Sequence, residues 1–171
     1  MENCEDGMCQ PGSLQIPMAK TEKRKSQEVI YVGDPMCSWC WGISDHLKEL
    51  QKYLHEEGID YNIIVGGLRP GGGDPWNQEM KNFLKHHWDE VNQRSGQPFG
   101  SRLFELDHFD YDTEPSCRAV VTAKHILDMG GVSSFFEEVQ RKFYVENEDP
   151  KDAAFYQSIC EKLNVDFGYF R

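Results

Sequence analysis

Two cysteines separated by two residues, Cys37 and Cys40, are the residues best suited to chemistry in this sequence of 171 residues. They follow a segment predicted as a strand and precede one predicted as a helix, which places Cys37 at a helix N-terminus. Unpaired backbone N–H groups and the helix dipole stabilise a thiolate there. Such a thiolate attacks a disulfide, and a second thiol resolves the mixed disulfide. We predict Cys37 as the nucleophile and Cys40 as the resolving thiol, with the redox potential tuned by Ser38, Trp39 and the preceding Pro35.

The same spacing occurs in zinc sites, where a CxxC pair supplies two of the four ligands. A CxxC placed in a βαβ unit favours redox chemistry over metal binding. A second pair, Cys4 and Cys9, is open to three interpretations. The first interpretation is an auxiliary redox pair that exchanges disulfides with the Cys37–Cys40 centre. The second is a four-cysteine metal site formed together with that centre, and the third is two exposed thiols without a role. We predict no metal and keep Cys4 and Cys9 as the candidate auxiliary redox pair.

The other two cysteines, Cys117 and Cys160, lie on predicted helices without a nearby partner in the sequence. Because free cysteine is among the most buried residue types, both are predicted to be core residues. Three tryptophans, Trp39, Trp41 and Trp76, are open to two interpretations: an apolar face beside Cys37 that accepts unfolded peptide, or ordinary core packing.

The first elements form a strand, a helix and a strand. Residues 28–33 and 60–66 have the β-branched and aromatic content of strands. Between them, apolar residues recur at i, i+4, i+7 and i+11 on one face of a helix that ends at Gly58, namely Ile43, Leu47, Leu50 and Leu54. Two strands joined by a helix form a βαβ unit, most simply parallel and right-handed.

The chain beyond the glycine-rich loop 66–75 is predicted to be mainly helical. We expect helices over 76–95, from 114 to the glycine pair at 130–131, over 132–143 and over 155–163, with 103–112 extended or irregular. Residues 1–27 hold few large apolar side chains and are predicted to be a flexible leader.

Composition limits the class of protein. The chain has 29 acidic and 18 basic residues, a net charge of −11, which argues against nucleic acid as a partner. With 39% apolar residues it can build a core, but no apolar run approaches the roughly 20 residues that span a bilayer. The N-terminal residues lack the basic and apolar regions of a secretory signal, so a cytoplasmic location is expected.

The segment 34–42, with the sequence DPMCSWCWG, resembles the active-site motif of DsbA-family thioredoxin-like proteins. Within that family it is most similar to the cytoplasmic FrnE-like branch of predicted protein-disulfide isomerases. Three further blocks match that branch in order: GGLRP at 66–70, Trp88 through RSGQPF at 94–99, and TEPSCRAV at 113–120. The similarity runs from about Val29 to the C-terminus.

This resemblance implies an α/β fold with a thioredoxin-like βαβ core and a large α-helical insertion. It divides the chain into the leader 1–27, a thioredoxin-like half at 28–70 that holds the CxxC, and a helical insertion at 71–171. It also implies dithiol–disulfide exchange by Cys37 and Cys40 on protein or small-thiol disulfides, without an organic cofactor. The cis-proline loop and closing strands of that superfamily have no counterpart here, so we expect them to be missing from this chain.

Two other functions stay open. A glutathione-dependent relative of kappa-class transferases and hydroxychromene-carboxylate isomerases would share the fold, but such relatives need no resolving cysteine. A metal-binding or interaction module without catalysis is the non-enzymatic alternative, and the missing closing strands are the feature that favours it.

Overall fold

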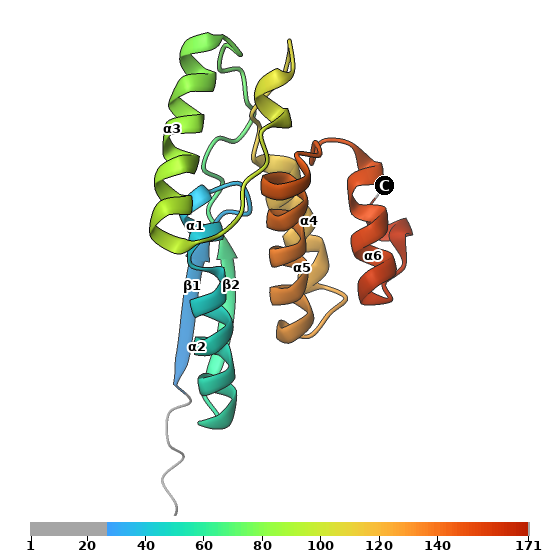
Figure 1. Cartoon of the computed structure of the whole chain (residues 1–171). Helices are drawn as coiled ribbons and strands as arrows, with labels where there is room; N and C mark the ends of the chain where they lie inside the picture. The colour runs from blue at the N-terminus through green and yellow to red at the C-terminus, as the bar shows by residue number, and fades with distance from the viewer. Residues whose placement is uncertain (1–26, 171) are drawn as a thin grey trace, which may run out of the picture.

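The computed structural model describes residues 27–170, so the predictions for the leader, Cys4 and Cys9 lie outside the described residues. The N-terminal part consists of two strands and two helices: β1 (Glu28–Gly33), α1 (Ser38–Gly42), α2 (Ser44–Glu56) and β2 (Asp60–Val65). The strands pair in parallel from Glu28 opposite Asp60 to Gly33 opposite Val65, as predicted. Figure 1 shows α2 running alongside both strands, as expected when a helix connects two parallel strands.

The rest of the described chain is helical. Its longer elements are α3 (Gln78–Ser95), α4 (Glu114–Lys124), α5 (Met129–Arg141) and α6 (Gln157–Leu163). Shorter turns of 3₁₀ or π geometry are η1 (Arg102–Glu105), η2 (Lys142–Glu146), η3 (Ala153–Tyr156) and η4 (Phe167–Phe170). The result is a mixed α/β fold, mainly helical, with a two-stranded sheet. None of the helices in residues 27–170 is long and apolar enough to cross a membrane.

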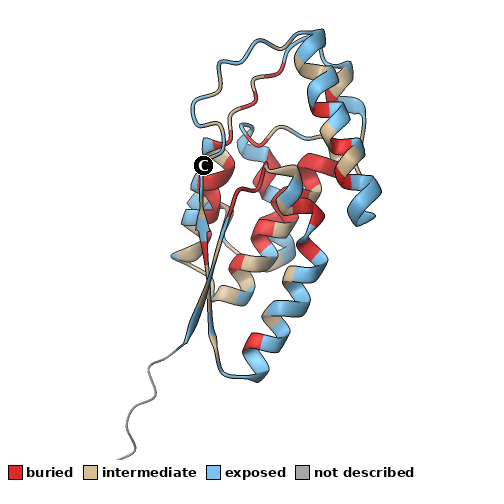
Figure 2. Cartoon of the chain, turned by 90° about the vertical axis from the view of Figure 1, so that its left-hand side faces the viewer, coloured by how far each residue is buried: buried red, intermediate tan, exposed pale blue. Residues whose placement is uncertain are grey.

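One core joins the sheet to the C-terminal helices. Ile63 of β2 packs with apolar side chains from α4, α5 and α6, and each is almost fully buried. On α5 these side chains repeat at i, i+3, i+4 and i+7, which places them on one helix face: Val132, Phe135, Phe136 and Val139. Figure 2 shows the buried residues gathered where the helices meet, whereas most of α2 is exposed.

A second core supports the start of α1. Trp88 of α3 packs against Phe143 and Tyr144, with ring centroids 5.9 Å and 5.1 Å away, and is 2% exposed. Trp41 of α1 stacks on Tyr144 and donates a hydrogen bond from its indole N–H to the carbonyl of Pro98 at 3.0 Å. The short helix that holds the CxxC is therefore fixed against α3 and the turn that follows α5.

Two of the predicted helices are wrong in their limits. The helix predicted from 114 to 130–131 ends at Lys124, and α5 begins at Met129. The Asp128 carboxylate accepts a hydrogen bond from the N–H of Gly131 at 2.8 Å. An aspartate that caps a helix in this way starts a new helix, so the glycine pair lies in a first turn rather than at a C-terminus.

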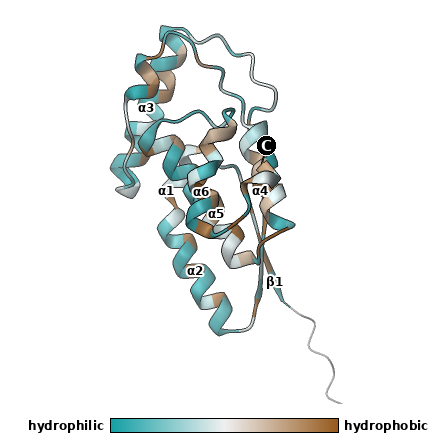
Figure 3. Ribbon diagram, turned by 90° about the vertical axis from the view of Figure 1, so that its right-hand side faces the viewer, coloured by the Kyte–Doolittle hydropathy of each residue, from teal (hydrophilic) through white to brown (hydrophobic). Residues whose placement is uncertain are grey.

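The single helix expected from Cys37 to Gly58 is divided at Ile43, whose φ and ψ are −95° and 4°. Of the predicted apolar face, Leu54 is buried, but Ile43 and Leu50 are 40% and 37% exposed. The division lets α1 pack against α3 while α2 follows the sheet. Figure 3 shows that α2 consists mainly of hydrophilic residues.

Candidate active site

The CxxC lies where β1 passes into α1. Asp34, Pro35 and Met36 turn the chain, and the N–H of Cys37 donates to the carbonyl of Asp34 at 3.0 Å. Cys37 is the N-cap of α1, the position that the sequence predicts for it. Cys37 and Cys40 are both free thiols and both are half-buried.

Gly42 determines how closely α1 approaches α3. A Cβ at Gly42 would lie 2.7 Å from Cγ1 of Val91, closer than two carbon atoms tolerate. A larger residue would push α1, and the cysteines on it, away from α3. The glycine that follows the CxxC therefore belongs to the architecture of the site.

Hydrogen bonds stabilise the thiolate of Cys37. The hydrogen bond from the Cys40 side chain makes the largest contribution to lowering the pKa of Cys37, and the backbone N–H groups of Cys40 and Trp39 lower it further. Burial and the Asp34 charge raise it. The net effect lowers the pKa of Cys37 from 9.0 to about 6. With that pKa, about nine-tenths of Cys37 is ionised at pH 7.

Cys40 is perturbed in the opposite direction. Its hydrogen bond to Cys37 and its burial raise its pKa well above the ordinary value. The Tyr31 side chain opposes this shift by a hydrogen bond that favours the Cys40 thiolate. One thiol of the pair is therefore ionised and the other protonated, which matches the difference expected between an attacking and a resolving cysteine.

The Asp34 carboxylate is 4% exposed and joins three segments beside the site. One oxygen accepts the N–H of Met36 at 2.7 Å, and the other accepts the N–H of Leu68 at 2.6 Å and the thiol of Cys117 at 3.3 Å. Burial and the Asp34 charge raise the pKa of Cys117 to about 12, so Cys117 stays protonated and donates.

The loop after β2 brings a cation to the site. The backbone N–H of Arg69 donates to Oγ1 of Thr113 at 2.9 Å, and its carbonyl accepts the N–H of Thr113 at 3.1 Å. The guanidinium pairs with Asp74 and lies 5.8 Å from the ring centre of Tyr111. The Tyr111 hydroxyl in turn donates to the carbonyl of Met36 at 2.8 Å. These contacts hold the loop and the CxxC turn together.

A cleft of about 430 Å³ opens beside Cys37. Its lining is mainly apolar, with one cation and one imidazole, and includes Trp39, Leu68, Arg69, Phe83 and His87. Trp39 is 42% exposed and lies 5.5 Å from the Arg94 guanidinium. The cleft can hold a small thiol compound or a peptide segment against the Cys37 sulfur.

Of the predicted site residues, Cys37, Ser38 and Trp39 line this cleft, Cys40 follows them on α1, and Pro35 is buried in the preceding turn. Trp41 is a core residue and Trp76 packs against Phe109, so neither lines this cleft. Cys117 and Cys160 are buried, which confirms the prediction that they are core residues.

Within residues 27–170, no group of three or more His, Cys, Asp or Glu side chains is arranged to hold a metal ion. The four-cysteine metal interpretation includes Cys4 and Cys9 and so lies outside the described residues.

Sequence reasoning missed Tyr31, Asp34 and Arg69 as residues of the site. Asp34 and Arg69 were visible only as parts of a turn and a loop, because the contacts that place them at the site are distant in sequence: Asp34 accepts the N–H of Leu68, and the backbone of Arg69 pairs with Thr113. The one available signal was a carboxylate three residues before the first cysteine of the CxxC. Tyr31 belongs to a strand, where a tyrosine is an ordinary residue.

No protein-family model matches the sequence. The structure is similar to the crystal structure of a Nitrosomonas europaea protein assigned as a protein disulfide isomerase, with a TM-score of 0.73 and 31% identity. That match covers 85% of this chain and 69% of the other. The cytosolic disulfide reductase DsbM from Pseudomonas aeruginosa matches with a TM-score of 0.70 and 23% identity, over 84% of this chain and 67% of DsbM. DsbM with GSH matches with a TM-score of 0.63 and 25% identity, over 84% and 69%.

A curated relative is the ClpXP adapter protein SpxH from Halalkalibacterium halodurans. It is 23% identical over 179 residues, which include 99% of this chain and 56% of SpxH. The chain thus spans about half the length of this relative.

Proposed function

The chain belongs to the DsbA family of thiol-disulfide oxidoreductases, and from that premise we propose that it exchanges disulfides through Cys37 and Cys40. The observation that carries the proposal is the opposite perturbation of the two thiols, one with a pKa lowered to about 6 and the other protonated. Each thiol is thereby prepared for a different step.

In the first step the Cys37 thiolate attacks one sulfur of a substrate disulfide. The substrate S–S bond breaks, a Cys37–substrate disulfide forms, and the first substrate thiolate leaves and takes up a proton. Cys40 then loses its proton, and its sulfur attacks the sulfur of Cys37. The second substrate thiolate leaves, so the substrate gains two electrons and two protons while Cys37 and Cys40 become a disulfide. A thiol or dithiol reductant reverses the change in the protein.

The cleft supports a choice of substrate. Its apolar side chains favour a peptide or the stem of a small thiol, and its one cationic lining residue, Arg69, already pairs with Asp74. We therefore propose protein disulfides and small-thiol mixed disulfides, such as those of glutathione, as substrates. The structure of DsbM with GSH supports this choice. We also propose a cytoplasmic location, as for the cytosolic DsbM.

Turnover of insulin disulfides and of a glutathione mixed disulfide tests this function. Cys37→Ser is expected to abolish both activities, whereas Cys40→Ser retains the first attack and accumulates a mixed disulfide on Cys37. Cys160→Ser is the matched control, since Cys160 is buried among residues of the first core. Equal activity of the wild type and Cys37→Ser would contradict the proposal.

A further inference from the structure

Tyr111 is a buried tyrosine whose hydroxyl reaches the residue before the nucleophile. The residue is 3% exposed, and its hydroxyl donates a hydrogen bond to the carbonyl of Met36 at 2.8 Å. Its ring packs against those of Phe109 and Phe143 in the second core. These contacts hold the hydroxyl at the Met36 carbonyl. The segment 103–112, which the sequence predicts as extended or irregular, therefore contributes a side chain to the CxxC turn.

The Met36 carbonyl lies just outside the hydrogen bonds of α1. In a longer helix it would accept the N–H of Cys40, four residues later. The helix begins one residue further on, where the N–H of Trp41 donates to the carbonyl of Cys37 at 3.1 Å. In the part of the chain that the structure describes, no backbone N–H donates to the Met36 carbonyl, and Met36 is 1% exposed. Because buried carbonyls are nearly always hydrogen-bonded, the Tyr111 hydroxyl supplies a donor that would otherwise have to come from elsewhere.

The other donor within reach is one that the nucleophile needs. Cys37 is the N-cap of α1, with φ and ψ of −91° and 116°, and an N-cap side chain lies next to the N–H groups of the second and third helical residues. Those residues are Trp39 and Cys40, whose N–H groups stabilise the Cys37 thiolate. If the N–H of Cys40 turned to the Met36 carbonyl, Cys37 would become the first residue of a longer helix. Its thiolate would then lose that donor.

We propose that Tyr111 is a positioning residue of the disulfide exchange: its hydroxyl occupies the Met36 carbonyl, so that Cys37 stays at the N-cap and the N–H of Cys40 stays beside its sulfur. The inference rests on the proposed function, because it concerns how the attacking thiolate is held. The Asp34 carbonyl accepts the N–H of Cys37 at 3.0 Å and fixes the other side of the same peptide group. Tyr111 transfers no proton, because burial raises its pKa and keeps the hydroxyl protonated.

Alkylation of Cys37 by iodoacetamide from pH 4 to pH 10 tests the proposal in full-length Tyr111→Phe, with the Cys37 peptide followed by mass spectrometry. Loss of one hydrogen bond to a charged group changes an ionisation constant by about tenfold or more. The inflection of the alkylation curve is therefore expected to rise by about one pH unit or more, and alkylation at pH 7 to slow by about twofold or more. Above pH 9 the two rates should converge. The other titratable groups near Cys37 keep their charge in this variant: Tyr31, Asp34, Cys40, Arg69, His87 and Tyr144.

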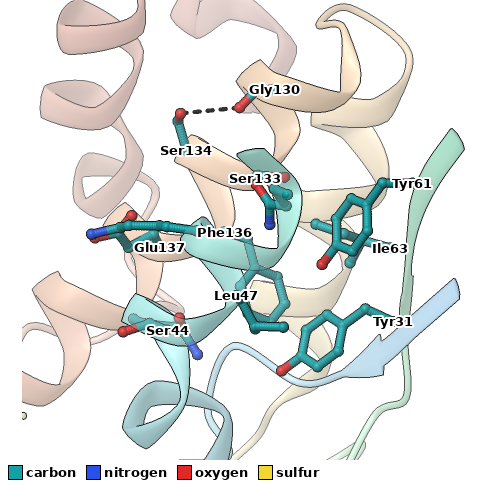
Figure 4. Close-up of a pocket in the computed structure, with 13 residues that line it drawn as sticks. Tyr31, Ser44, Leu47, Tyr61, Ile63, Gly130, Ser133, Ser134, Phe136 and Glu137 are labelled. Atoms are coloured by element: carbon teal, nitrogen blue, oxygen red, sulfur yellow. Dashed lines mark hydrogen bonds and ion pairs between the residues drawn. The ribbon is translucent and has the colours of Figure 1, made fainter. Parts of the chain in front are cut away.

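Two control variants remove a tyrosine hydroxyl elsewhere. Tyr156 is 5% exposed, and its hydroxyl donates to the carbonyl of Pro150 at 2.8 Å, a bond of the same kind and length. Tyr61 lines a separate cavity of about 200 Å³ between the sheet, α2 and α5, and Figure 4 shows its ring on the sheet side of that cavity. Tyr156→Phe and Tyr61→Phe are expected to leave the alkylation curve of Cys37 unchanged. This holds even where urea unfolding shows similar losses of stability in Tyr156→Phe and Tyr111→Phe.

A wild-type inflection near pH 6 that stays in place in Tyr111→Phe would overturn the inference. Equal slowing at every pH would also overturn it, because the hydroxyl would then affect access to the sulfur and not its ionisation. A wild type whose curve rises only near pH 9 would instead contradict the proposed function, since its nucleophile would not be ionised at neutral pH.

If Tyr111→Phe does not fold, the wild-type protein decides. We expect the hydroxyl proton of Tyr111 to give a resolved NMR signal that exchanges slowly with water, because the group is buried and hydrogen-bonded. A hydroxyl proton that exchanges too fast to be observed would rule out the hydrogen bond, and the positioning role with it.

Discussion

Replacing Cys40 by alanine tests why Cys37 is ionised at neutral pH. The Cys40 side chain makes the largest contribution to lowering the pKa of Cys37, and alanine removes it. The backbone N–H groups of residues 40 and 39 remain, so the pKa is expected to rise from about 6 toward its ordinary 9.0 without reaching it. Serine at position 40 keeps a hydroxyl donor and should give a smaller rise.

The expected slowing of Cys37 alkylation follows from the ionised fraction of Cys37 at the lowest and the highest pKa considered. At pH 7 a thiol with a pKa of about 6 is about 0.9 ionised, and one with a pKa of 9.0 is about 0.01 ionised. Because only the thiolate is alkylated, Cys40→Ala should slow alkylation of Cys37 at pH 7 by less than about 90-fold, the ratio of these two fractions. Above pH 9 the rates of the variant and the wild type should converge.

The assay is alkylation by iodoacetamide across the range from pH 4 to pH 10. Mass spectrometry of the peptide that contains Cys37 distinguishes it from the other thiols. Cys160→Ala is the matched control and should leave the curve unchanged. An inflection that stays near pH 6 in Cys40→Ala would refute the reasoning, because the backbone donors alone would then account for the ionisation.

Three further predictions concern stability. The reduced wild type should become more stable relative to Cys37→Ser as the pH rises from about 6 to 9, because the pKa of Cys37 is lower in the folded state than in the unfolded state. This added stability is lost as the pH falls through 6. Urea unfolding at several pH values measures the difference in the free energy of unfolding. Asp34→Asn should lower the free energy of unfolding by about 2 kcal/mol, because the amide turns a donor toward buried donors, whereas exposed Asp45→Asn should change it little. Gly42→Ala should lower the free energy of unfolding by about 2 kcal/mol, because the added methyl group meets Val91. The double variant with Val91→Ala should lose less stability than the sum of the losses in the two single variants.

The sequence alone predicts those elements that depend on patterns of neighbouring residues. The strands at 28–33 and 60–65, their parallel pairing and the apolar face of α5 follow from periodicity and connection length. The N-cap position of Cys37 follows from the order of strand, CxxC and helix. These features depend on neighbours in the chain, which a pattern reports directly.

The rest depended on contacts that a pattern does not report. The division at Ile43 adjoins the close contact of Gly42 with Val91, a residue of another helix. The site roles of Asp34 and Tyr31 need Leu68, Cys117 and Cys40 to come close in space. The helix limit at 130–131 was misread because Asp128 caps a new helix, although an aspartate three residues before a glycine was visible in the sequence.

The most direct test of the central claim is a redox titration of the full chain in glutathione buffers, with the disulfide between Cys37 and Cys40 quantified by peptide mass spectrometry. We predict that this disulfide forms reversibly as a two-electron transition and that its midpoint becomes more oxidising in variants that stabilise the thiolate of Cys37. A pair that stays reduced across the whole range of buffers would contradict the account.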